Sequence, residues 1–316
     1  MHHLTLDKEI SSNFLLDRDM GIPKSQLEAW SHQGSISQSS NTYNAIKGAL
    51  ENSSAPYAGK DFKVFLQGSY GNDTNIYAES DVDIVIKLNS CFKSDLSKLD
   101  ESEKAAYKSA FRDATYTHVD FKRDVLSVLT NQYGNSVTSG SKAITIDANG
   151  SRRKSDVIVA IKYRRYFKFR SLNDSSYAEG ICFWNSDGQL IANYPIQHSH
   201  NLTTKHQKTS KLLKPLARIF KNMRSRMIEE RLITSSTAPS YFIEGLLYNV
   251  PDDKLTFSYE NSVVNILNWY QQEASKKELV CANEQYYLLR DGSHTCWNQK
   301  NSDEYIEAAI ELWNQW

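Results

Sequence analysis

The sequence has little cysteine, no excess of either charge and no long hydrophobic run. Its four cysteines form no Cys-x-x-Cys pair, which argues against a disulfide framework and against a zinc ribbon. The 37 basic and 37 acidic residues cancel, so long duplex nucleic acid is not expected to be a required substrate. The chain has neither a stretch long enough for a transmembrane helix nor the apolar start of a signal peptide. We therefore expect a cytoplasmic protein with no membrane contact.

The length of 316 residues suffices for two lobes that share a cleft. Apolar strands dominate the first part of the chain, and from about Thr203 the pattern is helical. The fold class predicted is α+β, with a catalytic sheet lobe over residues 1–200 and a helical lobe over residues 201–316. Two helices are expected in the first lobe: one over residues 23–51, interrupted near its middle, that bridges both lobes, and one over residues 100–131.

Residues 67–87 combine a Gly-Ser turn with two aspartates, two positions apart, that open an apolar strand. Alternate side chains of a strand share a face, so Asp81 and Asp83 point one way while their valine and isoleucine neighbours point into the core. Converging carboxylates suit hard divalent cations such as Mg2+. An isolated Asp-x-Asp is usually only a surface strand or turn, but the combination predicts a metal-dependent nucleotidyl-transfer site.

The Gly-Ser turn closes a strand that we predict over residues 62–67. Gly68 lets the backbone approach a phosphate closely, because it has no side chain. The exposed N–H groups of such a turn, together with the Ser69 hydroxyl, suit a polyphosphate. We therefore expect Gln67, Gly68 and Ser69 to bind the nucleotide.

A site for two ions needs a third carboxylate on a neighbouring strand, and Asp156 is the candidate. It opens a second apolar strand, which follows a strand predicted over residues 142–147 and an Asn-Gly-Ser turn. Every second residue of the Asp156 strand faces the core, so Asp156 faces the other side, where it can join Asp81 and Asp83. Taken alone, Asp156 could instead be a turn-capping residue.

These motifs resemble those of the polymerase-β-like nucleotidyltransferases: the Gly-Ser turn, the Asp-x-Asp and the later Asp-Val-Ile-Val-Ala. More narrowly, the segments at 191–198 and 214–221 resemble the bacterial cGAS/DncV-like nucleotidyltransferases (CD-NTases), in particular the CdnE-like clade. These segments read Ile-Ala-Asn-Tyr-Pro-Ile-Gln-His and Lys-Pro-Leu-Ala-Arg-Ile-Phe-Lys. The resemblance covers about residues 62–251. It departs at Ala160, where many relatives have proline, a position that carries no ligand group.

The resemblance implies several nucleotide-binding residues in the helical part. Lys221 is the first candidate to contact the donor triphosphate, and Arg218 is the second. A solvated basic helix face is the simpler interpretation of this pattern. Ser240 and Tyr241 match a Ser-Tyr pair that contacts the phosphate tail and stacks on the base in relatives, while Tyr241 could equally be a core aromatic. Asn201 would read a uracil edge through its amide, or would only cap the helix that follows.

The resemblance also implies the reaction. Two ions, Mg2+ or Mn2+, would be held by Asp81, Asp83 and Asp156, and the substrates would be ribonucleoside triphosphates, ATP or UTP or both. The product would be a cyclic dinucleotide or cyclic oligonucleotide that activates an effector protein in defence against phage. Two rival hypotheses are a linear nucleotidyltransferase acting on RNA or protein, which a strongly basic surface would favour, and a non-catalytic nucleotide-binding module, which three carboxylates argue against.

Overall fold

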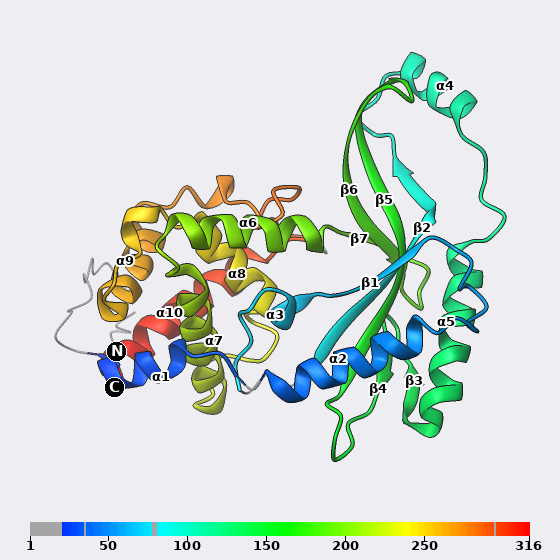
Figure 1. Ribbon diagram of the computed structural model, residues 1–316. Helices are drawn as coiled ribbons and strands as arrows, with labels where there is room; N and C mark the ends of the chain where they lie inside the picture. Colours follow the sequence, from blue (N-terminus) through cyan, green and yellow to red (C-terminus); the bar gives the residue numbers. More distant parts are fainter. Residues whose placement is uncertain (1–20, 35, 78–80, 294) are drawn as a thin grey trace, which may run out of the picture.

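The computed structural model describes residues 21–34, 36–77, 81–293 and 295–316. A mixed sheet and a helical bundle lie side by side, with the bundle on the left and the sheet on the right in Figure 1. The predicted α+β class is confirmed. None of the helices in these residues combines the length and the apolar character needed to cross a membrane.

The sheet has seven strands in the described chain: β1 (Phe62–Leu66), β2 (Val82–Asp95), β3 (Val137–Ser139), β4 (Ile144–Ile146), β5 (Ser155–Ser171), β6 (Asp174–Trp184) and β7 (Leu190–Asn193). Their order is β1-β2-β5-β4-β3, and β6 pairs with the later part of β5 and with β7. The β2 and β5 strands run parallel, whereas the other pairs are antiparallel. The starts of β2 and β5 are therefore neighbours.

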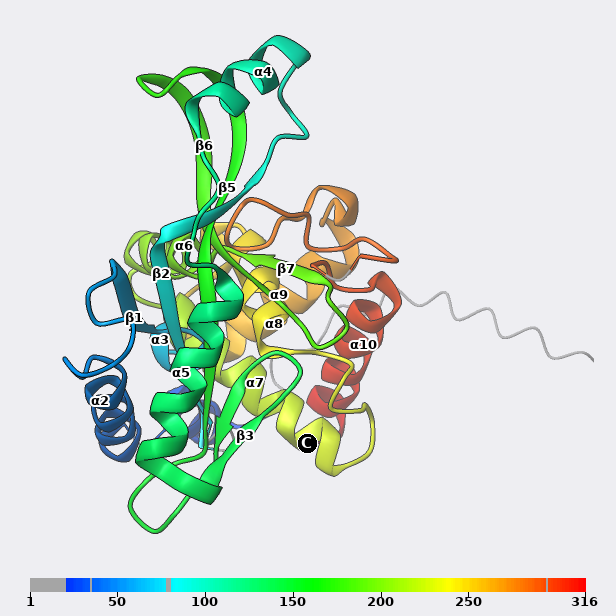
Figure 2. The same ribbon diagram turned by 90° about the vertical axis from the view of Figure 1, so that its right-hand side faces the viewer.

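The two faces of the sheet have different partners. On β2, Ile84, Ile86 and Leu88 are fully buried in a core that also contains Ile46 of α2 (Ser37–Leu50) and Phe121 of α5 (His118–Tyr133). Figure 2 shows α5 lying across this face, with the helical bundle behind the sheet. Because side chains alternate along a strand, the aspartate face of β2 points away from α5.

The second hydrophobic core lies in the bundle, with Leu216, Phe220 and Leu267 among its fully buried members. The bundle consists of α6 (Pro195–Lys208), α7 (Leu213–Glu229), α8 (Ser240–Asn249), α9 (Tyr259–Gln272) and α10 (Gln299–Gln315). α1 (Lys24–Ser31) also packs here, through Leu27. Since α2 packs on the sheet, the first two helices bridge both lobes with a break between them, as predicted for residues 23–51.

Two sequence-based boundaries are wrong. The helix expected over residues 100–131 is two helices, α4 (Glu101–Ala110) and α5, because Thr117 and Asp120 form a capping box that starts a new helix. The helical pattern expected from about Thr203 already begins at Pro195, and proline is well suited to the first turn of a helix.

Candidate active site

Asp83 and Asp156 lie directly opposite each other. They are paired residues in the parallel ladder of β2 and β5, so their side chains leave the same face of the sheet from strands about 4.8 Å apart. Both are partly exposed. Asp156 is also opposite Thr145 of β4, whose hydroxyl donates a hydrogen bond of 2.7 Å to Asp156 Oδ1. The register confirms the prediction that Asp156 joins Asp83 on one face of the sheet, and the turn-capping alternative for Asp156 is wrong because Asp156 lies within β5.

Asp81 has a partner of a different kind. It precedes β2, is exposed, and its Oδ2 accepts a hydrogen bond of 3.2 Å from Lys154 Nζ. That bond, and then the charges of Asp81 and Asp156, raise the pKa of Lys154. Across the described residues, no three acidic, histidine or cysteine side chains gather closely enough to hold a metal ion. The structure therefore brings Asp83 and Asp156 together and pairs Asp81 with a lysine.

The Gly-Ser turn is packed against Asp83. Gly68 opens the short helix α3 (Gly68–Gly71) with a φ of +65°, and a Cβ at this position would collide with the Asp83 carboxylate. The backbone N–H of Gln67 donates a hydrogen bond of 3.0 Å to the Asp83 carbonyl. Gln67 Oε1 is buried and accepts no hydrogen bond from the described residues. The glycine is thus required both by its positive φ and by the close approach of the carboxylate.

Lys221 of α7 reaches across to this turn. Its ammonium donates hydrogen bonds of 2.8 Å to Ser69 Oγ and 3.1 Å to Thr74 Oγ1, and its side chain is fully buried. The interpretation of this helix face as a solvated basic surface is therefore wrong for Lys221. Helical periodicity correctly predicted a basic face on this helix. Lys221 on that face packs against α3 and the loop that follows it rather than facing water.

The neighbouring cations of α7 bind the same loop. Lys214 is also buried, and its Nζ lies 2.9 Å from Asp73 Oδ2. Arg218 donates to the Asp73 carbonyl at 2.6 Å and to the Ser31 carbonyl at the end of α1. α7 begins at Leu213, so Pro215 stands in its first turn, where proline is tolerated. Arg218 therefore ties α1 and the loop together.

Glu244 of α8 is the residue that sequence reasoning missed. Its carboxylate accepts hydrogen bonds from Lys221, Asn72 and His198 at 2.8, 2.9 and 2.8 Å, and another from Thr74. Burial alone would raise the pKa of Glu244, but the Lys221 ammonium and the His198 hydrogen bond hold it well below its ordinary value. A glutamate within the apolar stretch Phe-Ile-Glu-Gly-Leu-Leu is the one sequence signal of a buried, paired charge.

The remaining predicted residues lie on the bundle side of this network. The Tyr241 ring stacks on His198, with centroids 4.8 Å apart, and its hydroxyl accepts a 2.8 Å hydrogen bond from Asn283. Ser240 Oγ lies 3.0 Å from Arg224 Nη1. Asn201 is inside α6 and donates to the Ala282 carbonyl at 2.8 Å, so the helix-capping alternative for Asn201 is wrong.

Comparison with known proteins places the chain among nucleotide synthases. Residues 200–314 match the cGAS/DncV-like nucleotidyltransferase C-terminal helical domain. The chain is 38% identical to the cyclic nucleotide synthase CdnE01 of Staphylococcus haemolyticus, over 94% of this chain and 100% of that protein. It is 35% identical to the cyclic dipyrimidine nucleotide synthase CdnE of Legionella pneumophila, over 89% and 94% of the two chains.

A solved structure is similar over nearly the whole fold. The structure of the Rhodothermus marinus CdnE c-UMP-AMP synthase with Apcpp and Upnpp superimposes with a TM-score of 0.83 and 36% sequence identity. The match covers 93% of this chain and 97% of that one. The similarity therefore extends over both lobes.

Proposed function

Since the chain belongs to the cGAS/DncV-like nucleotidyltransferases, close to the CdnE enzymes, we propose that it makes a cyclic nucleotide second messenger. The substrates are ribonucleoside triphosphates, and each bond is formed when a ribose hydroxyl attacks an α-phosphate and pyrophosphate leaves. A second such step on the linear intermediate closes the ring. The product is a cyclic dinucleotide or a small cyclic oligonucleotide.

One observation carries this proposal: the register that places Asp83 opposite Asp156, with Gly68 packed against the Asp83 carboxylate. The turn that suits a polyphosphate and the carboxylates that suit its counter-ions thus meet at one point. Ser69 connects this point to the helical lobe, because Lys221 of α7 donates a hydrogen bond to the Ser69 hydroxyl. A triphosphate at this turn would contact both lobes.

The donor set fits Mg2+ or Mn2+, because carboxylate oxygens are the ligands that these ions prefer. Asp83 and Asp156 would hold two ions together with Asp81, which would exchange its hydrogen bond with Lys154 for the metal. When bound, such ions neutralise phosphate charge and make a ribose hydroxyl more acidic. Thr145 fixes Asp156 through its hydrogen bond, so one carboxylate is oriented before any ion arrives.

The residues around the carboxylates position the donor nucleotide. The backbone N–H groups of the Gly68 turn and the Ser69 hydroxyl bind the phosphate tail, and Lys221 supplies positive charge behind Ser69. Arg218 acts on the loop rather than on the phosphate, because its guanidinium already binds the Asp73 and Ser31 carbonyls. Gln67 is proposed to bind the nucleotide as well, since its Oε1 accepts no hydrogen bond from the described residues.

At least one base of the product is proposed to be uracil, with ATP and UTP as the substrates. The support is that two of the relatives described above are named for pyrimidine-containing products, and that an amide such as that of Asn201 matches the uracil edge. Tyr241 and Ser240 are proposed to hold the base and phosphate tail. The product would activate an effector protein in cytoplasmic defence against phage.

The direct test is to incubate the purified chain with each labelled ribonucleoside triphosphate and Mg2+ or Mn2+, and then with phosphatase. Phosphatase-resistant products of cyclic mass, with pyrophosphate release, are expected. The Asp83→Asn and Asp156→Asn variants should form none at an unchanged melting temperature, because removing one of two repelling carboxylates does not weaken the fold. Phosphatase-sensitive products would instead indicate a linear transferase, and product formation by either variant would refute the assigned site.

A further inference from the structure

A cavity of about 700 Å³ lies between the later part of β2 and the connection from α4 to α5. A β-bulge of β2 forms part of its wall: Leu88 pairs with Ile161 and Phe92 with Lys162, so the three residues between Leu88 and Phe92 have no partner on β5. Asp83 pairs with Asp156, whereas Phe92 in the cavity wall pairs with Lys162, so the cavity lies six residues farther along β5, about 20 Å from the carboxylates.

The charge of the cavity wall is strongly positive for a protein without net charge. Lys60, Lys108 and Arg112 line it, against a single carboxylate, Asp113. The Lys60 ammonium lies 5.0 Å from the centre of the Tyr116 ring, and Arg112 donates a hydrogen bond of 3.5 Å to the Phe111 carbonyl. Neither Lys60 nor Arg112 forms an ion pair with any of the described residues. These cations remain available to an anion.

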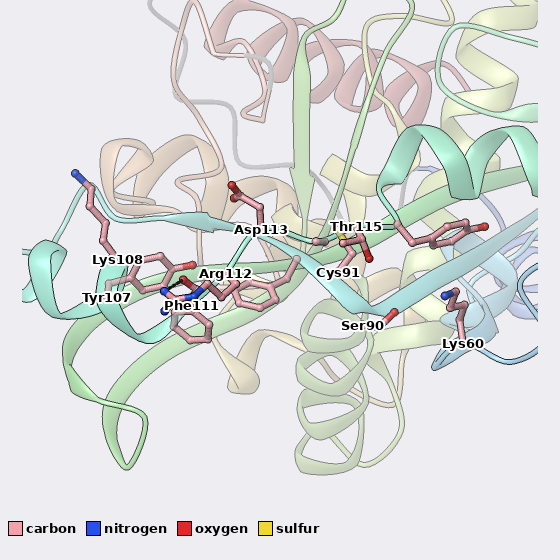
Figure 3. Close-up of a pocket in the computed structure, with 12 residues that line it drawn as sticks. Lys60, Ser90, Cys91, Tyr107, Lys108, Phe111, Arg112, Asp113 and Thr115 are labelled. Atoms are coloured by element: carbon pink, nitrogen blue, oxygen red, sulfur yellow. Dashed lines mark hydrogen bonds between the residues drawn. The ribbon is translucent and has the colours of Figure 1, made fainter.

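Aromatic rings form the apolar part of the wall. Phe92 and Phe111 meet edge to face at 5.2 Å, and Tyr107 lies 4.6 Å from Phe111. Figure 3 shows Tyr107, Phe111 and Arg112 at one end of the cavity, Ser90 and Cys91 along its middle, and Lys60 at the other end. A ligand that fits must therefore present a flat ring to Phe111 and negative charge to the cations.

We propose that this cavity binds a nucleotide, a small molecule with one aromatic base and a phosphate group, at a site separate from the carboxylates. Cavities of this volume are typical of small-molecule sites. Arg112 matches a phosphate through its planar fork and Lys60 through its point charge. The Phe111 ring stacks on the base, as aromatic side chains do with any nucleobase, and the Phe92 ring, which is at 80° to Phe111, meets the base with its edge. This inference goes beyond the proposed reaction and does not depend on it.

The test measures binding of AMP to the full chain by calorimetry in the presence of EDTA, which keeps metal-dependent binding at the carboxylates out of the signal. Saturable binding of AMP, much tighter than that of adenosine or inorganic phosphate alone, is expected. The variants Arg112→Glu and Lys60→Glu, separately and together, should weaken AMP binding by about tenfold or more, because each loses a charge-assisted hydrogen bond and adds repulsion. Both side chains are exposed, so the fold should persist.

The matched control is Arg170→Glu, which reverses an exposed cation of β5 outside the cavity and should leave AMP binding within about twofold of the wild type. Irradiation with azidoadenosine monophosphate should label the peptide of residues 107–116. Absence of saturable AMP binding would overturn the proposal. So would labelling at Ser69 or Tyr241 in place of that peptide, or unchanged affinity in the Arg112→Glu and Lys60→Glu variants.

Discussion

Lys221 and Glu244 form an ion pair in the interior, with Nζ and Oε1 2.8 Å apart and side chains only 0% and 3% exposed. The same ammonium reaches Ser69 of the Gly-Ser turn, so the pair connects the core of the bundle to the candidate active site. A buried ion pair need not stabilise a fold, because desolvating two charges is costly. The role that the structure supports for the Lys221–Glu244 pair is to fix the position of Ser69 relative to α7.

Replacing Glu244 with alanine should lower the free energy of unfolding by about 3–5 kcal/mol, because the buried Lys221 ammonium loses its counter-charge. Urea denaturation measures this change. The matched control is Glu229→Ala, since Glu229 is a largely exposed partner of Arg226 on α7, and its loss should cost less than about 0.5 kcal/mol. The double variant Lys221→Met/Glu244→Ala should be more stable than the sum of the single effects by at least about 1 kcal/mol, and strict additivity would contradict the pairing.

Gly68→Ala should reduce activity by about a hundredfold, because the added Cβ displaces the Asp83 carboxylate. It should also lower the free energy of unfolding by about 1–2 kcal/mol through its positive φ. Gly134→Ala separates the two effects, since Gly134 also has a positive φ, of +57°, but a Cβ there meets no atom within 4 Å. Pyrophosphate release should persist in Gly134→Ala, and equal activity losses in both variants would argue against the collision.

Lys154→Met should lower the metal concentration for half-maximal activity by about two- to fivefold. Lys154 competes with cations for Asp81, and the pair is half-exposed, so the effect is modest. A titration of pyrophosphate release with Mg2+ measures it. Lys162→Met, which removes a cation paired with Glu179, serves as the control. An increase in the metal requirement, or a higher KM for the triphosphate alone, would show that Lys154 binds phosphate instead.

His206→Gln should flatten the pH dependence of stability between pH 6.5 and about 4. Burial, and then the charges of Lys214 and Arg218, lower the pKa of His206 from 6.5 to about 4. In this interval the unfolded chain binds a proton that the folded chain does not, so wild-type stability falls as the pH falls. Urea denaturation at pH 7 and pH 5 should show a smaller loss for His206→Gln than for the wild type. His200→Gln, an exposed neighbour on α6, should retain the wild-type slope.

Asn201→Ser should weaken the preference for uridine in the product, because a serine hydroxyl is too short to reach the base edge and lacks the paired donor and acceptor. The loss of its hydrogen bond to Ala282 should also cost about 1 kcal/mol of stability. Product composition by mass spectrometry is the measurement. Asn265→Ser removes a comparable amide-to-backbone bond in α9 and should leave base choice unchanged. A purine-only wild-type product, or an unchanged preference in Asn201→Ser, would refute base reading by Asn201.

The sequence by itself determined the paired carboxylates. Strand alternation and the β-branched runs around Asp83 and Asp156 predict which face each aspartate takes, and the ladder of β2 and β5 confirms it. The Gly-Ser turn was also predictable, as a place where the backbone of Gly68 can approach another group closely because glycine has no side chain. These features depend on a few neighbouring residues and on the geometry of a single strand.

Only the tertiary structure decided the surroundings of those carboxylates. Periodicity identified the basic face of α7 but could not show whether that face meets water or protein. Lys221 is buried by Glu244 of the next helix and by Thr74 of a loop that is far away in the sequence. It could not show that Asp81 meets Lys154, a contact across two strand ends. The break between α4 and α5 was missed because capping by Thr117 outweighs a continuous apolar pattern. Local patterns set the faces of helices and strands, and long-range packing set what each face meets.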